Sequence, residues 1–264
     1  MDENGQKRGL GYYTLWMFSS LVLLFLVAPV LIVAIISLND SRILSFPPKT
    51  ISLRWFDRIV ADPAWRHSLW VSVQVALLAT CIATAAGFLA SFALIRASFR
   101  VKTGIYAFIL APMIVPNIIV AIAFYMAFAP FGASGSIIAM SIGHALLALP
   151  ITTVMLTANL QALDERYERA ALSLGASQWQ TMYMITLPLM LPGLISAALF
   201  AFLTSFDELL IGLFLAGIRT QTLTVRIWNS LSLQFEPTIA AVSTMLIGLT
   251  VTILVFNALL QRTK

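Results

Sequence analysis

The chain has 264 residues, of which 60% are hydrophobic and only 10% are charged, and its mean hydropathy is +0.93. Soluble domains carry about 25% charged residues. This chain cannot cover a water-exposed surface with polar groups, so its composition excludes a soluble domain. The apolar runs are long and unbroken, without the alternation typical of a membrane β-barrel. The sequence therefore predicts an all-α integral membrane protein.

The formal net charge of +5 would point to a nucleic-acid partner if the protein were soluble. Here the basic residues are scattered instead of gathered in a stripe, and Lys and Arg commonly flank membrane spans. We therefore expect contact with membrane lipid and no contact with nucleic acid.

The first apolar run, about 14–36, follows Lys7 and Arg8. It is too long for the apolar core of a signal peptide, and it offers no convincing cleavage site of small residues. We expect this run to be retained as a first membrane span.

Membrane-spanning helices need about 20 mainly apolar residues. Six stretches reach this length, at about 14–36, 69–95, 105–128, 136–160, 191–215 and 238–260. They predict a polytopic membrane protein with six transmembrane helices, organised as a single domain over residues 1–264.

The connections between these spans differ in charge. Arg96, Arg100 and Lys102 crowd the loop after the second span, whereas residues 130–135, on the opposite side, carry no charge. Basic loops tend to remain in the cytoplasm. With an even number of spans, we expect both termini and the 161–188 segment in the cytoplasm.

The 161–188 segment is a polar, partly amphipathic insert between the fourth and fifth predicted spans. Asp164 can cap a short helix that follows it, and Gly175 can end that helix in a left-handed turn. A second short helix is predicted over about 178–185, with Pro188 marking the return of the chain to the membrane. Such an element is stiff enough to pass force from a soluble partner to the spans.

The insert contains the pattern Ala-Ala-x-x-x-Gly, nine further residues and Ile-x-Leu-Pro. The matching positions are Ala170, Ala171, Gly175, Ile185, Leu187 and Pro188. This spacing resembles the EAA loop of ABC-importer permeases, although Arg169 stands where an acidic residue usually precedes the two alanines. The resemblance implies the type I ABC-importer permease fold and contact with a separate ATPase subunit. The implied coupling residues are Glu168, Ala170, Ala171, Gly175, Ala176, Leu187 and Pro188.

Further stretches carry a narrower resemblance. They are Phe46–Pro48, Ser52–Phe56, Ala111–Pro116, Ser205–Glu208 and Glu236–Ala240. These stretches look like the spermidine/putrescine branch of the permeases, and the resemblance covers nearly the whole chain. It implies a bacterial inner-membrane importer with a second permease subunit, two copies of a cytoplasmic ATPase subunit and a periplasmic substrate-binding protein.

No cofactor is expected on this chain. The phosphate-binding pattern G-x-x-x-x-G-K-S/T is absent, so ATP and Mg²⁺ are expected on the partner ATPase subunit. His67 and His144 are isolated, and no residues have metal-ligand spacing. Because no catalytic cluster is present, we expect a permease subunit and not an enzyme.

Asp207 and Glu208 are the only acidic residues in any predicted span. A carboxylate at the centre of a bilayer costs about 3 kcal/mol, so such residues usually face a polar interior or a partner. Neighbours on a helix point about 100° apart, so one acid would face the substrate pathway and the other a helix interface or the partner subunit. The opposite interpretation is that both acids only lock helix packing. Tyr125 is a further polar residue that either lines the pathway or packs.

The leading hypothesis is a permease subunit that imports a small cationic amine, a polyamine such as putrescine or spermidine, by alternating access. Acids beside the pathway would attract such a substrate. Alternatively, the same fold imports another small solute, an opine, an amino acid or a phosphonate, and the acids are structural. A third hypothesis is a membrane assembly protein or enzyme without transport activity.

Overall fold

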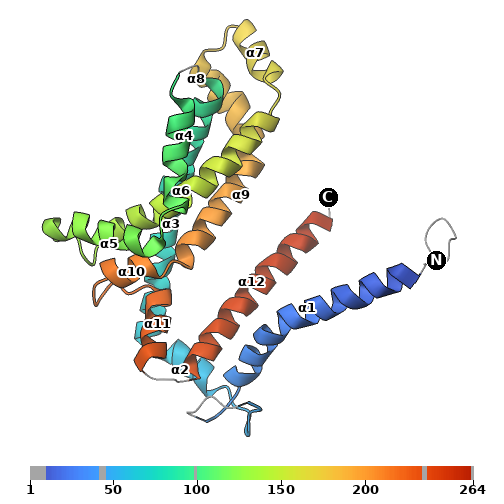
Figure 1. Cartoon of the computed structure of the whole chain (residues 1–264), viewed down its shortest axis with the longest axis vertical. Coiled ribbons are helices and arrows are strands. Elements are labelled where there is room, and N and C mark those ends of the chain that lie inside the picture. The colour runs from blue at the N-terminus through green and yellow to red at the C-terminus, as the bar shows by residue number, and fades with distance from the viewer. Residues whose placement is uncertain (1–9, 42–45, 98–99, 234–236, 263–264) are drawn as a thin grey trace. The chain divides into compact units, whose positions relative to one another are not determined.

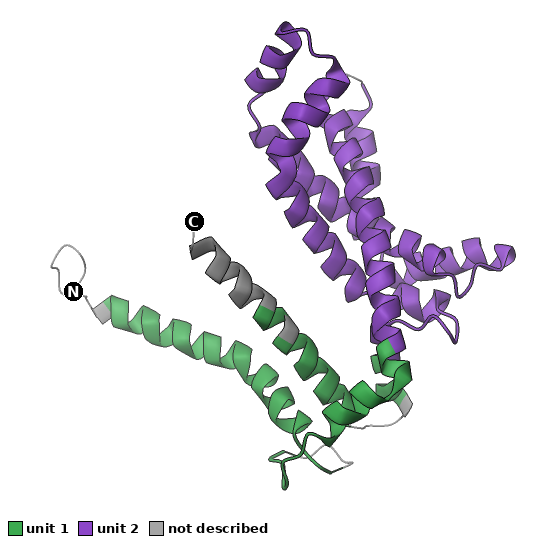
Figure 2. Cartoon of the chain, turned by 180° about the vertical axis from the view of Figure 1, so that it is seen from behind, with its two compact units in different colours: residues 1–66, 227–264 green, residues 67–226 purple. Residues whose placement is uncertain are grey.

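The computed structural model describes residues 10–41, 46–97, 100–233 and 237–262. Within these ranges every regular element is a helix, and the one β contact is an isolated bridge between Asn39 and Ile51. The all-α prediction is confirmed. Two compact units make up the chain, residues 1–66 with 227–264 and residues 67–226 (Figure 2). Three residues used above, Lys7, Arg8 and Glu236, lie outside the described residues.

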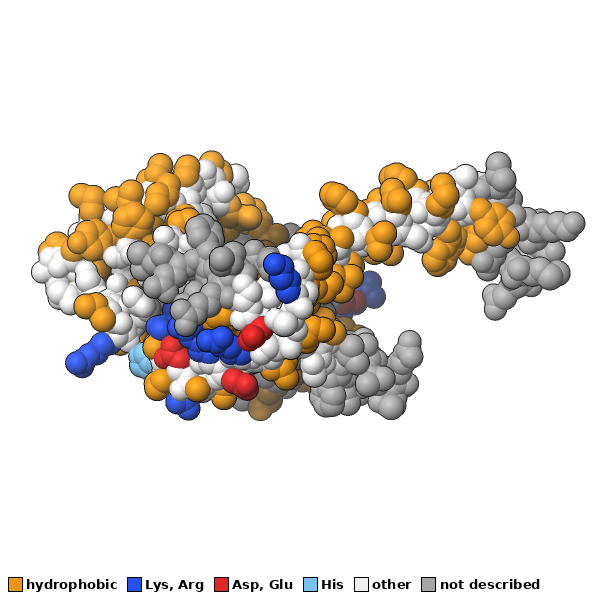
Figure 3. Space-filling view, turned by 90° about the horizontal axis from the view of Figure 1, so that it is seen from below, with side chains coloured by type: hydrophobic (Ala, Val, Ile, Leu, Met, Phe, Trp, Pro, Cys, Tyr) orange, Lys and Arg blue, Asp and Glu red, His pale blue; other side chains and the backbone are white. Residues whose placement is uncertain are grey.

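The first unit contains α1 (Leu10–Ser37), α2 (Arg54–Ala61) and α12 (Thr238–Arg262), and α12 packs against the other two. Trp55 of α2 is fully buried, and its Nε1–H donates to the carbonyl of Asn39 at 2.6 Å. By contrast, most side chains of α1 are exposed, and Figure 3 shows hydrophobic side chains along this helix. An apolar helix with so little cover from its own chain is suited to lipid or to a partner subunit.

The second unit holds the other helices. They are α3 (Pro63–Arg96), α4 (Lys102–Leu110), η1 (Ala111–Met113), α5 (Asn117–Phe128), η2 (Ala129–Phe131), α6 (Ile137–Ala162), α7 (Arg166–Ser173), α8 (Gln178–Thr181), the π-helical η3 (Met182–Thr186), α9 (Leu187–Phe206), α10 (Leu210–Leu215) and α11 (Leu223–Leu233). The first turn of α3 and the second half of α11 belong to the first unit. α6 contacts α4, α5, α9 and α10 and is the centre of this unit. α7 and α8 lie together at one end of it (Figure 1).

Small residues bring α3, α6 and α9 close together. A core cluster of alanines joins the three helices: Ala79, Ala83, Ala145, Ala148 and Ala201. Gly87 of α3 lies against Thr152 of α6, and Thr152 Oγ1 donates to the carbonyl of Ala83 at 3.1 Å. Gly193 of α9 lies in the same way against Asn159 of α6. Small side chains let helix backbones approach closely in membranes, so these helices form the framework that carries the insert.

Four described helices are long and apolar enough to cross a membrane: Gly11–Ser37, Pro63–Arg96, Ile137–Ala162 and Gln178–Phe206. They correspond to the first, second, fourth and fifth predicted spans. The sixth prediction, 238–260, lies in α12, whose described apolar part, Thr238–Thr252, is shorter than a span. Among the described helices there are thus four spans, or five if one bent pair counts as a span, where six were predicted.

The prediction of one continuous helix over 105–128 is wrong. Lys102–Met113 and Asn117–Phe131 are separate pieces bent by 98°, and Figure 1 shows α5 running at a steep angle to α4. The bend falls at Pro116, whose ring removes an amide donor and disfavours helical geometry at Val115.

The boundaries predicted for the fifth span, 191–215, are also wrong. The membrane helix ends at Phe206, and the chain is not helical again until α10 begins at Leu210. The carboxylate of Glu208 accepts a hydrogen bond from the N–H of Ile211 at 3.0 Å, so it satisfies a donor that the first turn of α10 leaves open. This local capping separates the two helices.

The second helix of the insert does not end near residue 185 as predicted, because Gln178–Phe206 is one continuous helix. Helical structure continues from the insert into α9 through η3, where the N–H of Leu187 bonds to the carbonyl of Met182. Pro188 falls in the first turn of α9, where a missing N–H is tolerated. The insert is therefore joined to the membrane helix by continuous helix.

Candidate functional site

The first helix of the insert, α7, is closed at both ends by local hydrogen bonds. Asp164 Oδ1 accepts from the N–H of Arg166 at 2.9 Å, so it satisfies a donor of the first turn as predicted, although the N-cap itself is Glu165, one residue later than expected. At the other end Gly175 has φ +88°, and the N–H of Ala176 bonds to the carbonyl of Ala171 at 3.1 Å. The N–H of Gly175 bonds to the carbonyl of Leu172 at 3.0 Å, which completes a Schellman motif. The predicted left-handed turn is confirmed.

The second helix of the insert, α8, begins with a capping box that the sequence reasoning missed. The N–H of Gln180 donates to Ser177 Oγ at 3.2 Å, and the N–H of Ser177 donates to Gln180 Oε1 at 2.8 Å. The pattern Ser-x-x-Gln was the available signal. With both helices capped, the turn at Gly175 connects two stiff pieces.

The tip of the insert exposes apolar side chains. Leu174 is 89% exposed beside Gly175, and Trp179 of α8 is also largely exposed. Of the predicted coupling residues, Ala170, Gly175 and Pro188 are exposed, while Ala171, Ala176 and Leu187 are half-buried. A tip with this composition is suited to docking on another protein.

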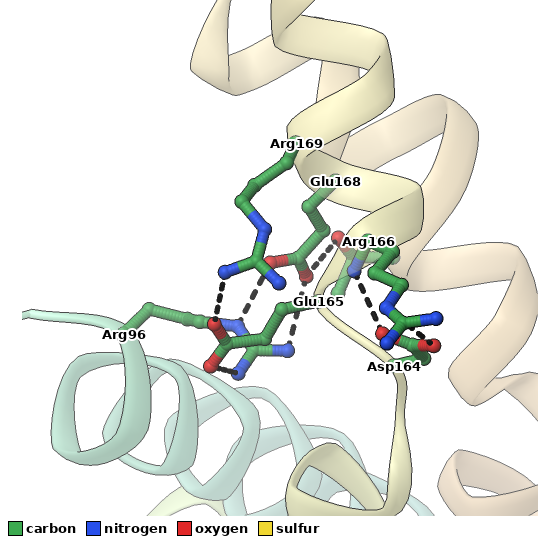
Figure 4. Close-up of polar contacts among 7 residues, drawn as sticks. Arg96, Asp164, Glu165, Arg166, Glu168 and Arg169 are labelled. Atoms are coloured by element: carbon green, nitrogen blue, oxygen red, sulfur yellow. Dashed lines mark hydrogen bonds and ion pairs between the residues drawn. The ribbon is translucent and has the colours of Figure 1, made fainter.

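Glu168 is turned away from this tip and into its own bundle. Its Oε2 lies 2.8 Å from Nε of Arg96, the last residue of α3, and each side chain is only 13% exposed. Its Oε1 accepts a hydrogen bond from Thr186 Oγ1 at 2.8 Å, and Thr186 is buried in η3. Figure 4 shows this carboxylate between α7 and the end of α3. Glu168 thus ties the insert to two membrane helices.

A second carboxylate extends the cluster. Glu165 Oε1 lies 2.9 Å from Arg96 Nη1, and Glu165 Oε2 lies 3.4 Å from Arg169 Nη1 (Figure 4). Arg169, the residue that departs from the EAA pattern, keeps 66% of its side chain exposed. Arg169 pairs with Glu165, one turn earlier at the start of the same helix. The less exposed of the two contacts with α3 is made by Glu168.

Arg96 is the member of this cluster that the sequence did not single out. It was interpreted only as one of several basic residues that orient the membrane spans. Its partner Glu168 is 72 residues away, and no local pattern in a single sequence reports a pairing over that separation.

The structure separates the two acids predicted for the substrate pathway. Asp207 caps the C-terminus of α9 through its backbone, and its side chain is exposed. Glu208 is buried, with its carboxylate on the N–H of Ile211. Glu208 therefore has a structural partner, while the Asp207 side chain is exposed.

Tyr125 lies on α5 and is 42% exposed. Its helix packs against α10, because Phe124 and Phe128 join the core cluster that contains Ile211. Among the described residues, no group of three His, Cys, Asp or Glu side chains could hold a metal ion.

Residues 82–264 match the family model described as the binding-protein-dependent transport system inner membrane component. The chain belongs to this family. It is a multi-pass inner-membrane permease subunit of a binding-protein-dependent ABC importer, and it is not the catalytic subunit. Membership implies an ATPase and a substrate-binding protein as partners, and it sets aside the hypothesis of an assembly protein or enzyme.

Two relatives are similar over most of this chain. The putrescine transport system permease protein PotI of Escherichia coli (strain K12) is 29% identical over 231 residues, 85% of this chain and 82% of that protein. The spermidine/putrescine transport system permease protein PotC of Haemophilus influenzae (strain ATCC 51907 / DSM 11121 / KW20 / Rd) is 30% identical over 246 residues, 93% of this chain and 95% of that protein.

The fold is also found in a solved structure. A crystal structure of a bacterial ABC transporter involved in the import of the acidic polysaccharide alginate matches with a TM-score of 0.65. The match covers 97% of this chain and 99% of that one at 14% identity. It shows the ABC-importer permease fold and nothing about the solute carried.

Proposed function

We propose that this permease subunit imports a small cationic amine, a polyamine such as putrescine or spermidine, by alternating access. The observation that carries the proposal is similarity to PotI and PotC, which extends over 82% and 95% of their lengths. ATP and Mg²⁺ bind to the separate ATPase subunit, and this chain carries no cofactor of its own.

In the proposed assembly, this chain forms one transmembrane domain, residues 1–264, beside a second permease subunit. Two copies of the ATPase subunit bind in the cytoplasm, and a periplasmic protein delivers the substrate. Six crossings are counted by taking the bent pair 102–131 as the third and α12 as the sixth. Both termini and the 161–188 insert are then cytoplasmic. The exposed apolar surface of α1 supports a position against lipid or the second permease subunit.

The coupling residues are those of the insert. Ala170, Ala171, Gly175 and Ala176 shape the tip that docks on the ATPase subunit, and exposed Leu174 supports an apolar contact there. Leu187 and Pro188 begin the membrane helix that receives the movement. Glu168 contributes from inside, through its contacts with Arg96 and Thr186. ATP binding shifts the population of permease conformations only if the ATPase subunit binds one of them preferentially.

The proposed substrate pathway passes Asp207, at the end of α9. Its exposed carboxylate attracts a cation, since opposite charges a few ångströms apart interact favourably even in a partly hydrated site. Tyr125 is the second proposed pathway residue, because it is exposed on a helix that packs against α10. Glu208 helps indirectly, because its cap on α10 fixes the turn that carries Asp207.

Uptake by the reconstituted complex tests this function. Labelled putrescine is added to proteoliposomes together with binding protein that is saturated with it. The uptake rate then depends on the permease and not on substrate binding to the periplasmic protein. Asp207→Asn should slow uptake about tenfold, equivalent to about 1.4 kcal/mol of lost attraction, and Asp207→Glu should restore most of the rate. Unlabelled spermidine should compete. Uptake of a labelled amino acid or phosphonate, with no putrescine uptake, would instead establish the alternative cargo.

A further inference from the structure

The cluster around Arg96 joins three elements that are far apart in the chain. Arg96 ends α3, Glu168 lies in the first turn of α7, and Thr186 lies in η3, immediately before α9. One carboxylate holds all three, with Oε2 at 2.8 Å from Arg96 Nε and Oε1 at 2.8 Å from Thr186 Oγ1. Movement of α7 is therefore passed to two membrane helices at the same point.

The environment favours a strong contact. Arg96 and Glu168 are each 13% exposed, so solvent and salt screen their attraction less than they screen a surface pair. The cation stands at the C-terminus of α3 and the anion in the first turn of α7, which suits both helix dipoles. Removing one partner from such a site leaves the other charge partly buried and without its counter-ion.

Packing alone ties α7 to α3 loosely. A cavity of about 600 Å³ lies between these elements and α8, and Arg96 and Glu168 form part of its wall with Phe92, Leu172 and Trp179. Since this space separates the apolar surfaces, the ion pair carries the connection across it. The exposed tip at Leu174 lies at the opposite end of α7, six residues or about 9 Å along the helix from Glu168.

We propose that Arg96 is a positioning residue for transport, which makes the coupling insert, α3 and α9 move as one body. The inference rests on the proposed docking of the insert on the ATPase subunit. Arg96 does not touch ATP, the substrate or the partner in this role. Its function is to convert displacement of the tip into displacement of both membrane helices, so its loss separates ATP hydrolysis from transport.

The test measures ATP hydrolysis and labelled-substrate uptake on the same proteoliposomes. Arg96→Gln should lower the number of substrates carried per ATP by about tenfold, while the hydrolysis rate changes by no more than about twofold. Arg96→Lys should restore part of the ratio. In the charge exchange Arg96→Glu with Glu168→Arg, recovery above either single variant would show direct pairing. Arg100→Gln, at an exposed basic residue of the same connection, is the matched control and should behave as the unmodified chain.

A normal ratio of uptake to hydrolysis in Arg96→Gln would overturn the inference. So would an equal loss of both activities, because that pattern indicates a structural defect. A cross-link separates these results from failure of the proposed function. After Cys81, the only cysteine, is replaced by Ser, Leu174→Cys should cross-link to the ATPase subunit. No cross-link would reject the docking itself, whereas a cross-link with full coupling in Arg96→Gln would reject only the role of Arg96.

Discussion

Gly87 of α3 lies so close to Thr152 of α6 that a β-carbon on Gly87 would stand 2.6 Å from Thr152 Oγ1. The hydroxyl at that position donates to the carbonyl of Ala83, so the glycine and the interhelical hydrogen bond depend on the same close approach. This contact is part of the helical framework that carries the insert.

Gly87→Ala should therefore destabilise the protein. Overpacking costs about 1–3 kcal/mol, which exceeds the 0.5–1 kcal/mol or so that alanine gains over glycine inside a helix. Thermal unfolding of the detergent-solubilised protein measures the difference. Gly104→Ala is the control, because no atom lies within 4 Å of its β-carbon position, and it should be neutral or stabilising. Adding Thr152→Ala to Gly87→Ala should recover stability, and a further loss would show that the hydroxyl is not the obstacle.

The buried indole of Trp55 anchors α2 to the end of α1. Trp55→Phe keeps an aromatic ring but removes the N–H that bonds to the carbonyl of Asn39. The loss of about 1 kcal/mol for one hydrogen bond should speed amide hydrogen exchange in α2 about fivefold. Trp70→Phe, at a residue 60% exposed, should leave the exchange unchanged. Equal effects of both substitutions would show that the hydrogen bond is not the cause.

Hydropathy predicted the helices but not where they break. The hydropathy of a stretch of sequence does not show in which direction its backbone runs. Residues 105–128 are therefore apolar and long enough for a span, although the chain turns at Pro116. The end of α9 was missed for a related reason: Leu209–Leu215 is apolar enough to extend the helix, and only the geometry of the Glu208 side chain shows a new cap. Both helix breaks therefore depend on single residues, Pro116 in the first case and Glu208 in the second.

The insert was the part best predicted, because its structure depends on neighbours in sequence. Asp164 and Gly175 close α7 through contacts within a few residues, and both were identified. Pro188 lies where the membrane helix begins, but the end predicted near residue 185 is absent, since a proline is accommodated in the first turn of a helix. The Arg96–Glu168 pair was beyond prediction, because tertiary packing alone brings the two residues together.

Glu208 provides a test of structural against pathway roles. Glu208→Ala removes the acceptor for the N–H of Ile211 and should cost about 1 kcal/mol, or about 3 °C in Tm. Glu208→Gln keeps an oxygen in the same place and should retain most of that stability. Uptake by Glu208→Gln should remain close to normal, in contrast to Asp207→Asn. A large uptake defect in a stable Glu208→Gln protein would move Glu208 into the pathway.

Gly175 tests whether the turn must keep its backbone conformation for coupling. At φ +88° a branched side chain such as Val costs about 1–2 kcal/mol, whereas Asn tolerates this region better. Among the described residues, no atom beyond its two chain neighbours lies within 4 Å of the β-carbon position, so a defect is not expected to come from an internal clash of that carbon. Gly175→Val should abolish uptake with membrane insertion intact, and Gly175→Asn should retain part of it.

Gly175→Ala separates the two reasons for such a loss. If the backbone conformation matters, Ala should be worse than the larger Asn, because Asn accepts a positive φ. If loss instead rises with side-chain size, so that Asn is worse than Ala, the turn is pressed directly against the ATPase subunit. Uptake rates and co-purified ATPase, measured on the same membranes, distinguish these outcomes. Normal uptake by Gly175→Val would contradict the coupling role of the insert.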